Sequence, residues 1–399
     1  MRSSDGVEPQ AQSPRVAIVH DWLTGMRGGE RVLEGLLDIF PDASLHTLVH
    51  VPGSVSPFIE DRDIVTSFID WLPLSHRKHQ IYLPLFPLAV RGLQLEGADL
   101  VISTSHCVAK GALAPPGVPH ICYCHTPMRY VWGFRDAYFA QQPRPVRFFI
   151  ERILDLLQNW DVASACRVDG WITNSHNVAG RLRSYYGVDS SVIYPPVDVD
   201  RFEFMGPRRR DFYLVVSALV PYKRIDLVVQ AASRLPFPLK IVGDGPERRR
   251  LESLSGSNVT FLGRLPDREV TSLMQHARAF IFPGEEDFGI TPVEAQAAGT
   301  PVIALRVGGA LETVTDGVTG VFFDDPTVSG LIGAIDRLEA LVLDPVVLRE
   351  KALEFEPGRF RSEIESFLTG FLDSGSWAIS YRPGSGLVFR LGAREAVTP

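Results

Sequence analysis

Cysteine is scarce in this sequence, and its few cysteines form no recognisable pattern. Four occur among 399 residues, at Cys107, Cys122, Cys124 and Cys166, and none lies in a C-x-x-C pair. So few thiols in a chain of this length fit a reducing compartment and argue against a disulfide-stabilised secreted protein. They also show no metal-ligand spacing. We therefore expect a cytoplasmic protein without a metal site built from cysteines.

Long hydrophobic runs are also absent. The longest apolar stretch, IYLPLFPLAV at 81–90, is too short to span a bilayer and contains two prolines. The first residues, MRSSDGVEPQAQSPR, are polar and lack the apolar core of a signal peptide. We expect no membrane-spanning segment, although the protein can still work close to a membrane.

Basic charge is not in excess, because the formal net charge is −7. This balance argues against a nucleic-acid-binding protein, whose binding domain is usually basic. Apolar residues make up 45% of the chain and charged residues 22%, an ordinary composition for a soluble globular protein with a sizeable core. The length suggests two or three domains.

Short apolar runs alternate with helical patterns along most of the chain. This alternation is typical of parallel sheets built from βαβ units. A proline-bearing connector at 192–202 separates two series of such runs, so we predict an α/β protein with two doubly wound, Rossmann-like domains facing a central cleft. Ligands of such sheets bind beyond the carboxyl ends of the strands. The expected strands are 15–20, 100–104, 120–123 and 170–173, then 212–218, 238–243, 258–263, 279–283, 301–304 and 320–323.

Three of the loops that follow strands carry residues suited to phosphate. Gly28 and Gly29 precede a helix, whose free N–H groups can bind an anion, although a plain turn explains them too. Lys223 and Arg224 open another helix, where cations oppose the helix dipole; they suit either an anionic ligand or solvent. Gly245 belongs to a partial G-x-G-x-x-G match, which we interpret as a tight turn near a nucleotide.

The stretch FPGEEDFGITPVEAQAAGTPVIA at 282–304 concentrates carboxylates at the end of a strand. Glu285, Glu286 and Asp287 repel one another, and no local structure explains Glu286. Acids that face a helix N-terminus suit a ligand with both hydroxyls and an anion, such as a sugar nucleotide.

Glu294, in the same stretch, has a simpler explanation. Thr291 is a good N-cap, Pro292 suits the first helical position, and Glu294 then stands where a capping box places its acid. The sequence therefore leaves two roles open for Glu294: capping its own helix or binding a ligand.

These segments together resemble a known family. EEDFGITPVEAQAAGTPVIA, in which seven residues separate Glu286 from Glu294, is similar to the E-x7-E motif of family-4 retaining glycosyltransferases of GT-B fold. VPYKRIDL, IVGDGPERRRLE, VTFLGRL and GGALETVTDGVTG occur in the family's order, and the likeness is strongest from 212 to 325. GGERVL and CHTPMRYVW resemble bacterial mannosyltransferase-like members of surface-polysaccharide pathways.

The resemblance implies a hexosyltransferase that moves a sugar, with mannose from GDP-mannose as our prediction, to a lipid-linked or glycan acceptor. Glu286 would contact the donor sugar beside the reacting carbon, and Glu294 would hold the ribose. Lys223 would neutralise the diphosphate, and His125 would line the sugar from the other domain. The further donor-binding residues would be Gly28, Gly29, Arg224, Gly245, Gly263, Phe288, Gly289 and Ile290.

The resemblance also divides the chain. It implies an acceptor-side domain at 15–200, a nucleotide-sugar-binding domain at 201–358 and a helix at 359–374 that crosses back to the first domain. We expect a flexible N-terminus at 1–14. The glycine-rich tail at 375–399 has no helical period, so we predict that it is poorly ordered.

One position departs from the family pattern. The family often has a basic residue where this chain has Ala218, so a second phosphate-binding cation is missing there. Arg224 or another arginine would have to compensate. No cofactor is expected, and we predict no metal. The D-x-D-like pairs at 61–63 and 198–200 are weak metal motifs, and the second lies in the proline-bearing connector, where a turn explains it better.

The same motifs are also compatible with other functions. A hydrolase or an epimerase could act on a sugar nucleotide without an acceptor, and a protein without turnover could simply bind one. The segment WLPLSHRKHQIYLPLFPLAVRG at 71–92 mixes tryptophan, basic and apolar residues. It suits peripheral contact with the anionic inner face of the plasma membrane, or a helix packed in the first domain.

Overall fold

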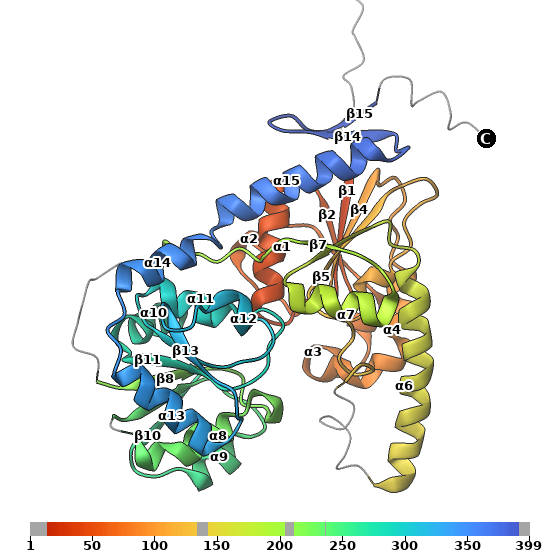
Figure 1. Cartoon of the computed structure of the whole chain (residues 1–399). Helices are drawn as coiled ribbons and strands as arrows, with labels where there is room; N and C mark the ends of the chain where they lie inside the picture. Colours follow the sequence, from red (N-terminus) through yellow and green to blue (C-terminus); the bar gives the residue numbers. More distant parts are fainter. Residues whose placement is uncertain (1–13, 134–142, 204–210, 236, 391–399) are drawn as a thin grey trace, which may run out of the picture.

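The computed structural model describes residues 14–133, 143–203, 211–235 and 237–390, which form two α/β domains (Figure 1). The expected flexible N-terminus, 1–14, falls outside the described residues except for Pro14. Each domain is built on one parallel sheet, as the alternation of apolar runs and helical patterns predicts.

The sheet of the N-terminal domain has the strand order β3-β2-β1-β4-β5-β6-β7, and all its pairs are parallel. Its four central strands are those predicted from apolar runs, and all their residues are buried. The outer strands escaped prediction because they are short and partly exposed: β3 and β7 at the two edges, and β2 next to β3. The strands are β1 (Val16–His20), β2 (Ser44–Thr47), β3 (Ile64–Thr66), β4 (Leu100–Ser105), β5 (His120–Cys124), β6 (Gly170–Thr173) and β7 (Ser191–Val192).

Helices cover both faces of this sheet, because apolar side chains point to both sides of a buried parallel strand. Ile18 packs with α1 on one face, and Val19 packs with α4 on the other. The segment 71–92 is a series of short helical turns, two of them containing proline, rather than one helix. The helices and 3₁₀ helices (η) are α1 (Gly28–Ile39), α2 (Pro57–Glu60), η1 (Phe68–Trp71), α3 (Ser75–Lys78), η2 (His79–Leu85), α4 (Phe86–Arg91), η3 (Ala109–Gly111), α6 (Arg144–Ala165) and α7 (His176–Tyr186).

The C-terminal domain repeats this architecture with the strand order β10-β9-β8-β11-β12-β13. All six of these strands coincide with runs predicted from the sequence. They are β8 (Tyr213–Val216), β9 (Leu239–Val242), β10 (Val259–Gly263), β11 (Ala279–Phe282), β12 (Val302–Leu305) and β13 (Gly320–Phe323). The flanking helices are η4 (Pro221–Lys223), α8 (Ile225–Ala231), η5 (Ala232–Arg234), α9 (Arg248–Leu254), α10 (Asp267–His276), α11 (Ile290–Ala297), α12 (Ala310–Thr313), α13 (Val328–Glu339) and α14 (Pro345–Leu353).

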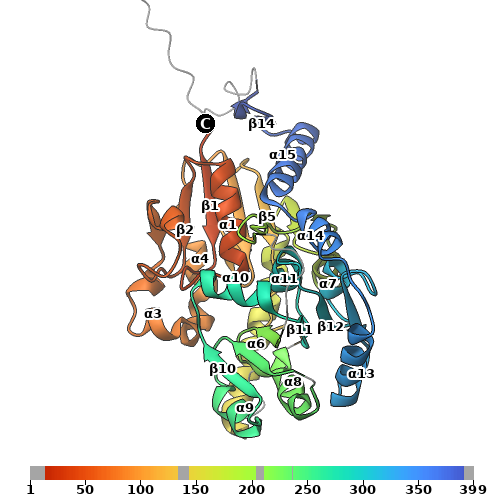
Figure 2. The same ribbon diagram turned by 90° about the vertical axis from the view of Figure 1, so that its left-hand side faces the viewer.

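The last long helix, α15 (Pro357–Ser374), runs from the C-terminal domain back across the N-terminal domain (Figures 1 and 2). Its buried stripe of Phe360, Ile364, Leu368 and Leu372 joins the core beneath α1. Gly35 of α1 allows this contact, since a Cβ atom there would lie 2.7 Å from the Phe360 ring. The helix therefore ties the two domains together.

The tail after Gly375 is more ordered than the sequence predicted. Strands β14 (Ile379–Arg382) and β15 (Gly386–Phe389) form an antiparallel pair that packs on α15. Ile379, Tyr381 and Leu387 enter the N-terminal core. The prediction of a poorly ordered tail was therefore wrong up to residue 390, because the hairpin gains its stability from a helix that periodicity within the tail does not reveal. Residues 391–399 lie outside the described part of the chain.

Candidate active site

The two sheets bring the predicted residues together at the carboxyl ends of their strands. In each sheet the chain order reverses beside the first strand, between β1 and β4 in one and between β8 and β11 in the other. Such switch points are where loops diverge and leave room for a ligand. His125 follows β5, Lys223 lies in the loop after β8, and Glu286 lies in the loop after β11. The chemistry is therefore concentrated where the two domains face each other.

Lys223 and Glu286 form an ion pair, through Nζ of the lysine and Oε1 of the glutamate. Their side chains retain 14% and 18% of their exposure, so both are largely shielded from water yet reachable. Gly284 makes this contact possible, because a Cβ atom there would lie 2.7 Å from Cα of Lys223. The two loops are far apart in sequence and meet at Gly284, where any residue with a Cβ atom would clash with the backbone of Lys223.

The charge of Lys223 is sensitive to its surroundings. Burial, and next the positive charge of Arg129, lowers the pKa of Lys223 to about 7, while Asp287 acts in the opposite direction. The Glu286 carboxylate in contact with the ammonium group also favours its charged form. Neighbouring anions therefore favour the charged form of Lys223, which is the form that can bind a diphosphate.

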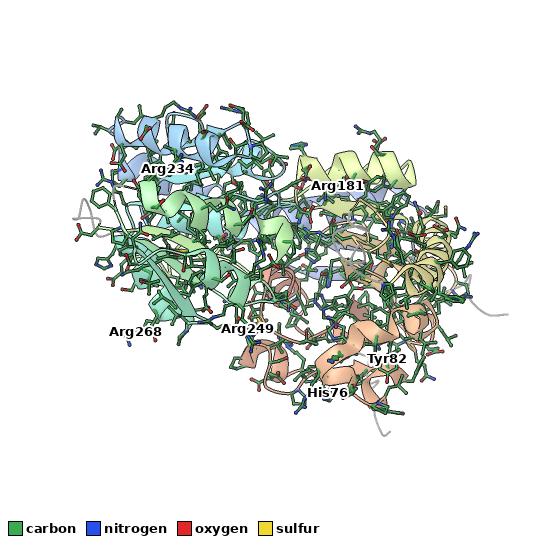
Figure 3. All side chains as sticks on the ribbon, turned by 90° about the horizontal axis from the view of Figure 1, so that it is seen from below. His76, Tyr82, Arg181, Arg234, Arg249 and Arg268 are labelled. Atoms are coloured by element: carbon green, nitrogen blue, oxygen red, sulfur yellow. The ribbon has the colours of Figure 1, made fainter. Side chains whose placement is uncertain are left out.

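The acids on either side of Glu286 have a different role. Asp287 pairs with Arg129 and, at 2.5 Å, with Nη1 of Arg181, and Glu285 lies 2.6 Å from Nη2 of Arg181. Both arginines belong to the N-terminal domain, and Figure 3 shows Arg181 on α7. The repulsion among three adjacent acids is thus relieved by cations of the other domain. The sequence analysis missed both arginines, although unbalanced acids at 285–287 were a signal that cations must lie nearby.

Glu294 does not cap its helix, so the predicted capping box was wrong. Helix α11 begins at Ile290 after Gly289, which has a φ of 90° and provides no side-chain cap. The Glu294 carboxylate instead lies 2.7 Å from Nη2 of Arg201. Burial raises the pKa of Glu294, and Arg201 counteracts this. The helix starts one residue before Thr291 because glycine alone tolerates this left-handed conformation at low cost.

The N-termini of two helices meet across the interface. A Cβ atom at Gly28, which begins α1, would lie 2.8 Å from Cδ1 of Ile290, which begins α11. A Cβ atom at Gly29 would lie 3.6 Å from Nε2 of His125. Free backbone N–H groups and the positive ends of both helix dipoles are therefore gathered beside His125, in an arrangement suited to phosphate.

His125 is half-buried on the N-terminal side of the site. Its Nε2 lies 2.6 Å from Oγ1 of Thr104, and its carbonyl oxygen accepts a hydrogen bond from Asn174 at 3.0 Å. Burial, followed by the charges of His106 and His20, lowers the pKa of His125 well below its usual value. The imidazole is therefore neutral at neutral pH, and it can form hydrogen bonds without repelling Lys223.

The side chains of two predicted donor-binding residues are engaged elsewhere. Phe288 is buried in the core, where its ring lies 5.5 Å from that of Tyr194 and 5.4 Å from that of Phe355. Arg224 donates to its own helix, since Nε lies 3.2 Å from Oδ1 of Asp226. Phe288 therefore positions the loop through packing and offers a ligand its backbone at most.

The predicted glycines of the C-terminal domain allow its loops to pack closely. A Cβ atom at Gly245 would lie 2.3 Å from the carbonyl oxygen of Leu219, so the loops after β8 and β9 touch there. Gly263 ends β10 with a φ of 72°, close to Arg248. The partial glycine motif thus forms a tight turn between β9 and α9, as predicted.

A cavity of about 240 Å³ lies between the segment after β5, helix α7 and Glu285 of the loop after β11. Trp132 and Tyr185 stack at its edge with ring centres 4.3 Å apart and planes 9° from parallel. The lining residues are Thr126, Pro127, Arg129, Trp132, Gly133, Arg181, Tyr185 and Glu285.

Two family models match consecutive parts of the chain. The model described as Glycosyltransferase Family 4 matches residues 26–201, and that described as Glycosyl transferases group 1 matches residues 198–354. The chain belongs to the family-4 glycosyltransferases of GT-B fold. The boundary between the two matches falls in the connector between the two sheets.

Known relatives agree with this family assignment. The D-inositol 3-phosphate glycosyltransferase of Mycobacterium tuberculosis is 34% identical over 203 residues, which span 44% of this chain and 42% of the relative. The match thus covers less than half the length of the curated relative. Among solved structures, sucrose-phosphate synthase of Thermosynechococcus elongatus has a TM-score of 0.67 at 19% identity, over 91% of this chain and 100% of that one. Anabaena HepE in complex with UDP-glucose has a TM-score of 0.63 at 17% identity, over 89% and 99%.

Within the described residues there is neither a metal-binding cluster nor a membrane-spanning helix. Over the ranges that the structure describes, no three His, Cys, Asp or Glu side chains are grouped so that they could hold a metal ion. In those same ranges, no helix combines the length and apolar character needed to cross a bilayer.

Proposed function

We propose that this glycosyltransferase-family protein transfers a hexosyl group from a nucleotide-diphosphate sugar to a hydroxyl group of a lipid-linked or glycan acceptor, with retention of configuration. The observation that supports this best is the Lys223–Glu286 ion pair at the carboxyl ends of the strands. It combines a cation for a diphosphate with a carboxylate that can accept hydrogen bonds from sugar hydroxyls.

In the proposed reaction, the bond between the anomeric carbon and the diphosphate oxygen breaks, and its electron pair stays on the diphosphate. The acceptor oxygen forms its bond to the anomeric carbon on the same face, and its proton passes to the departing phosphate oxygen. The products are the new glycoside and a nucleoside diphosphate. Lys223 and the free N–H groups at Gly28, Gly29 and Ile290 would stabilise the charge that develops on the leaving group.

The two remaining predicted residues act on the donor in this proposal. Glu294 accepts hydrogen bonds from the ribose after exchanging part of its contact with Arg201. His125 remains neutral and contacts the sugar from the N-terminal side. We also expect turnover without added divalent metal, because Lys223 and the two helix N-termini supply positive charge. Unchanged initial rates in EDTA would support this expectation, and their loss would refute it.

For the donor, we propose mannose from GDP-mannose, because the segment CHTPMRYVW resembles mannosyltransferase-like members of the family. A thermal-shift screen against GDP, UDP and ADP sugars tests this choice. GDP-mannose should raise the melting temperature most. A larger shift with UDP-glucose, which is bound in the Anabaena HepE structure, would replace the donor in the proposal.

For the acceptor, we propose a lipid-linked sugar reached by peripheral contact with an anionic membrane. Within the segment 71–92, Trp71 is 82% exposed and Leu88 65%, and Arg77 and Lys78 supply positive charge. His76 and Tyr82, labelled in Figure 3, lie on this segment. Apolar and basic side chains together favour an anionic bilayer surface.

Vesicle binding tests the membrane contact. Anionic vesicles at low salt should bind the wild type, and the double variant W71A/L88A should bind at least about tenfold more weakly. Val342→Ala, at a fully exposed apolar position of the C-terminal domain, is the matched control. If the wild type ignores anionic vesicles, the membrane part of the proposal is wrong.

The reaction itself is tested by incubating the donor with and without acceptor lipid. Glycosylated lipid and a nucleoside diphosphate should appear together. Free sugar without acceptor would indicate a hydrolase, an altered sugar would indicate an epimerase, and binding without any product would indicate a nucleotide-sugar-binding protein. Each of these three results would contradict the proposed transfer.

A further inference from the structure

The site lacks a cation where the family pattern would place one. Ala218 stands in the loop after β8, so Arg224 or another arginine has to compensate. The Arg224 guanidinium is held by Asp226, with Nε 3.2 Å from Oδ1 and Nη2 3.5 Å from Oδ2. Its charge is thus engaged on the surface of its own helix, so the compensating group has to be sought elsewhere.

Arg129 of the N-terminal domain reaches the same place from the opposite side. It lies in the segment after β5, four residues beyond His125, and its side chain is 20% exposed. Its Nη2 pairs with Asp287 and lies 4.0 Å from Oε2 of Glu286. Arg129 therefore contacts the loop that carries the proposed catalytic carboxylate.

Lys223 and Arg129 converge on one carboxylate. Lys223 pairs with Oε1 of Glu286, and Arg129 approaches Oε2. Both cations also lie over the ring of Tyr222, with Nζ of Lys223 5.4 Å and Cζ of Arg129 5.6 Å from its centre. Two positive groups, one from each domain, thus occupy a single small volume beside Glu286.

Asp287 would not be stranded if Arg129 turned toward a ligand. Arg181 holds the other carboxylate oxygen of Asp287 at 2.5 Å and also binds Glu285 at 2.6 Å. Removing one partner from a buried charge is costly when no other partner remains. Here a second arginine stays in place, so Arg129 can exchange a carboxylate for a phosphate at low cost.

We propose that Arg129 supplies the second cation at the leaving diphosphate, in place of the basic residue that Ala218 lacks. This inference rests on the proposed function. The diphosphate would displace the carboxylates from Arg129 and lie between it and Lys223. Because the two cations belong to different domains, full stabilisation of the leaving group would require both domains to contact the same ligand.

The test compares Arg129 with Arg181, which makes the same kind of interdomain ion pair. In R129A, kcat should fall by about 10²–10³-fold and the affinity for the nucleoside diphosphate by about tenfold, as expected when one stabilising donor is lost. R129K keeps the charge but loses the planar guanidinium, which can bind two oxygen atoms at once, so its kcat should fall by about tenfold. R181K keeps a cation on Asp287 and Glu285, so Asp287 retains a partner when Arg129 turns to the ligand, and kcat should change by less than about threefold.

A rescue variant separates a ligand contact from a structural one. Placing the cation on the other side, as A218R in the R129A background, should recover at least about tenfold in kcat. Thermal unfolding checks that each variant is folded. If R129A does not fold, R129K replaces it in the comparison of kcat with the wild type.

Two results would overturn the inference alone: a kcat of R129A within threefold of the wild type, or an equal loss of kcat in R129K and R181K with no rescue of R129A by A218R. A wild-type protein that turns over no nucleotide sugar would overturn the proposed function itself, and this inference with it.

Discussion

The two sides of the candidate site differ in charge. The C-terminal side offers Lys223, Glu286 and Glu294, all ionisable groups close to the interface. The N-terminal side offers His125, kept neutral by burial, and the backbone at Gly28 and Gly29. One side can therefore bind charge and orient hydroxyls, while the other shapes the pocket without adding charge of its own.

The arginines of the N-terminal domain are the exception, and they show how the two sides are joined. Arg129 and Arg181 reach the acids at 285–287, and Glu312 of the C-terminal domain accepts hydrogen bonds from the backbone N–H groups of His176 and Asn177 at 2.8 and 3.0 Å. These charged contacts lie around the site itself. The ligand and the domain interface therefore compete for some of the same groups.

The largest expected effect comes from the carboxylate at the centre of the C-terminal side. Glu286→Gln should lower kcat by about 10²–10⁴-fold, because the amide cannot stabilise positive charge on the sugar. The melting temperature should stay within a few degrees of the wild type. Glu285→Gln, at the neighbouring acid that binds Arg181, is the control. An equal fall in its kcat would contradict the separate roles of Glu286 and Glu285.

Lys223→Ala should weaken donor binding and turnover together, each by about tenfold or more, because the leaving diphosphate loses its nearest cation. Isothermal titration with the nucleoside diphosphate and steady-state kinetics measure the two effects. Unchanged kinetics would refute the role of Lys223 and leave Glu286 without its partner in the mechanism.

Glu294→Gln should reduce donor affinity by about tenfold and leave the melting temperature unchanged, because the glutamate binds Arg201 and no helix N-terminus. Titration with the nucleoside diphosphate and thermal unfolding provide the two readings. A lowered melting temperature with normal donor affinity would contradict the ribose role and indicate that Glu294 acts only structurally, through Arg201.

A smaller effect concerns pH. A lysine is charged below its pKa and loses its proton as the pH rises through it. Since burial, with Arg129, lowers the pKa of Lys223 to about 7, affinity for the nucleoside diphosphate should fall roughly several-fold between pH 6.5 and 8.5. Lys223→Arg keeps its charge throughout, so its pH profile should be flat over this range. If affinity fell equally with pH in the wild type and in Lys223→Arg, the pH dependence would not come from Lys223.

The smallest effect on activity is expected far from the site. Ile379→Ala removes a buried side chain of the tail hairpin and should lower the free energy of unfolding by about 2–4 kcal/mol. Turnover at low temperature should remain unchanged. Denaturant unfolding measures the stability, and no change would mean that the hairpin contributes little to the N-terminal core.

Prediction from sequence succeeded where the relevant pattern is local. Buried parallel strands are continuous apolar runs, so the central strands of both domains were found, and Lys223 and Glu286 stood out in the loops that follow them. Prediction failed at Glu294, where Gly289 rather than Thr291 precedes the helix. It also failed for the tail, whose apolar residues pack on α15 and into the N-terminal core.

By itself, the sequence determined the two sheets, the loops that carry the chemistry and the family to which the chain belongs. Only the tertiary structure decided which partners those loops meet: Arg129 and Arg181 for the acids at 285–287, Arg201 for Glu294, and Ile290 for Gly28. The physical reason is that strand and helix patterns repeat over a few residues, whereas these ion pairs join residues more than ninety positions apart, with no periodic signal between them.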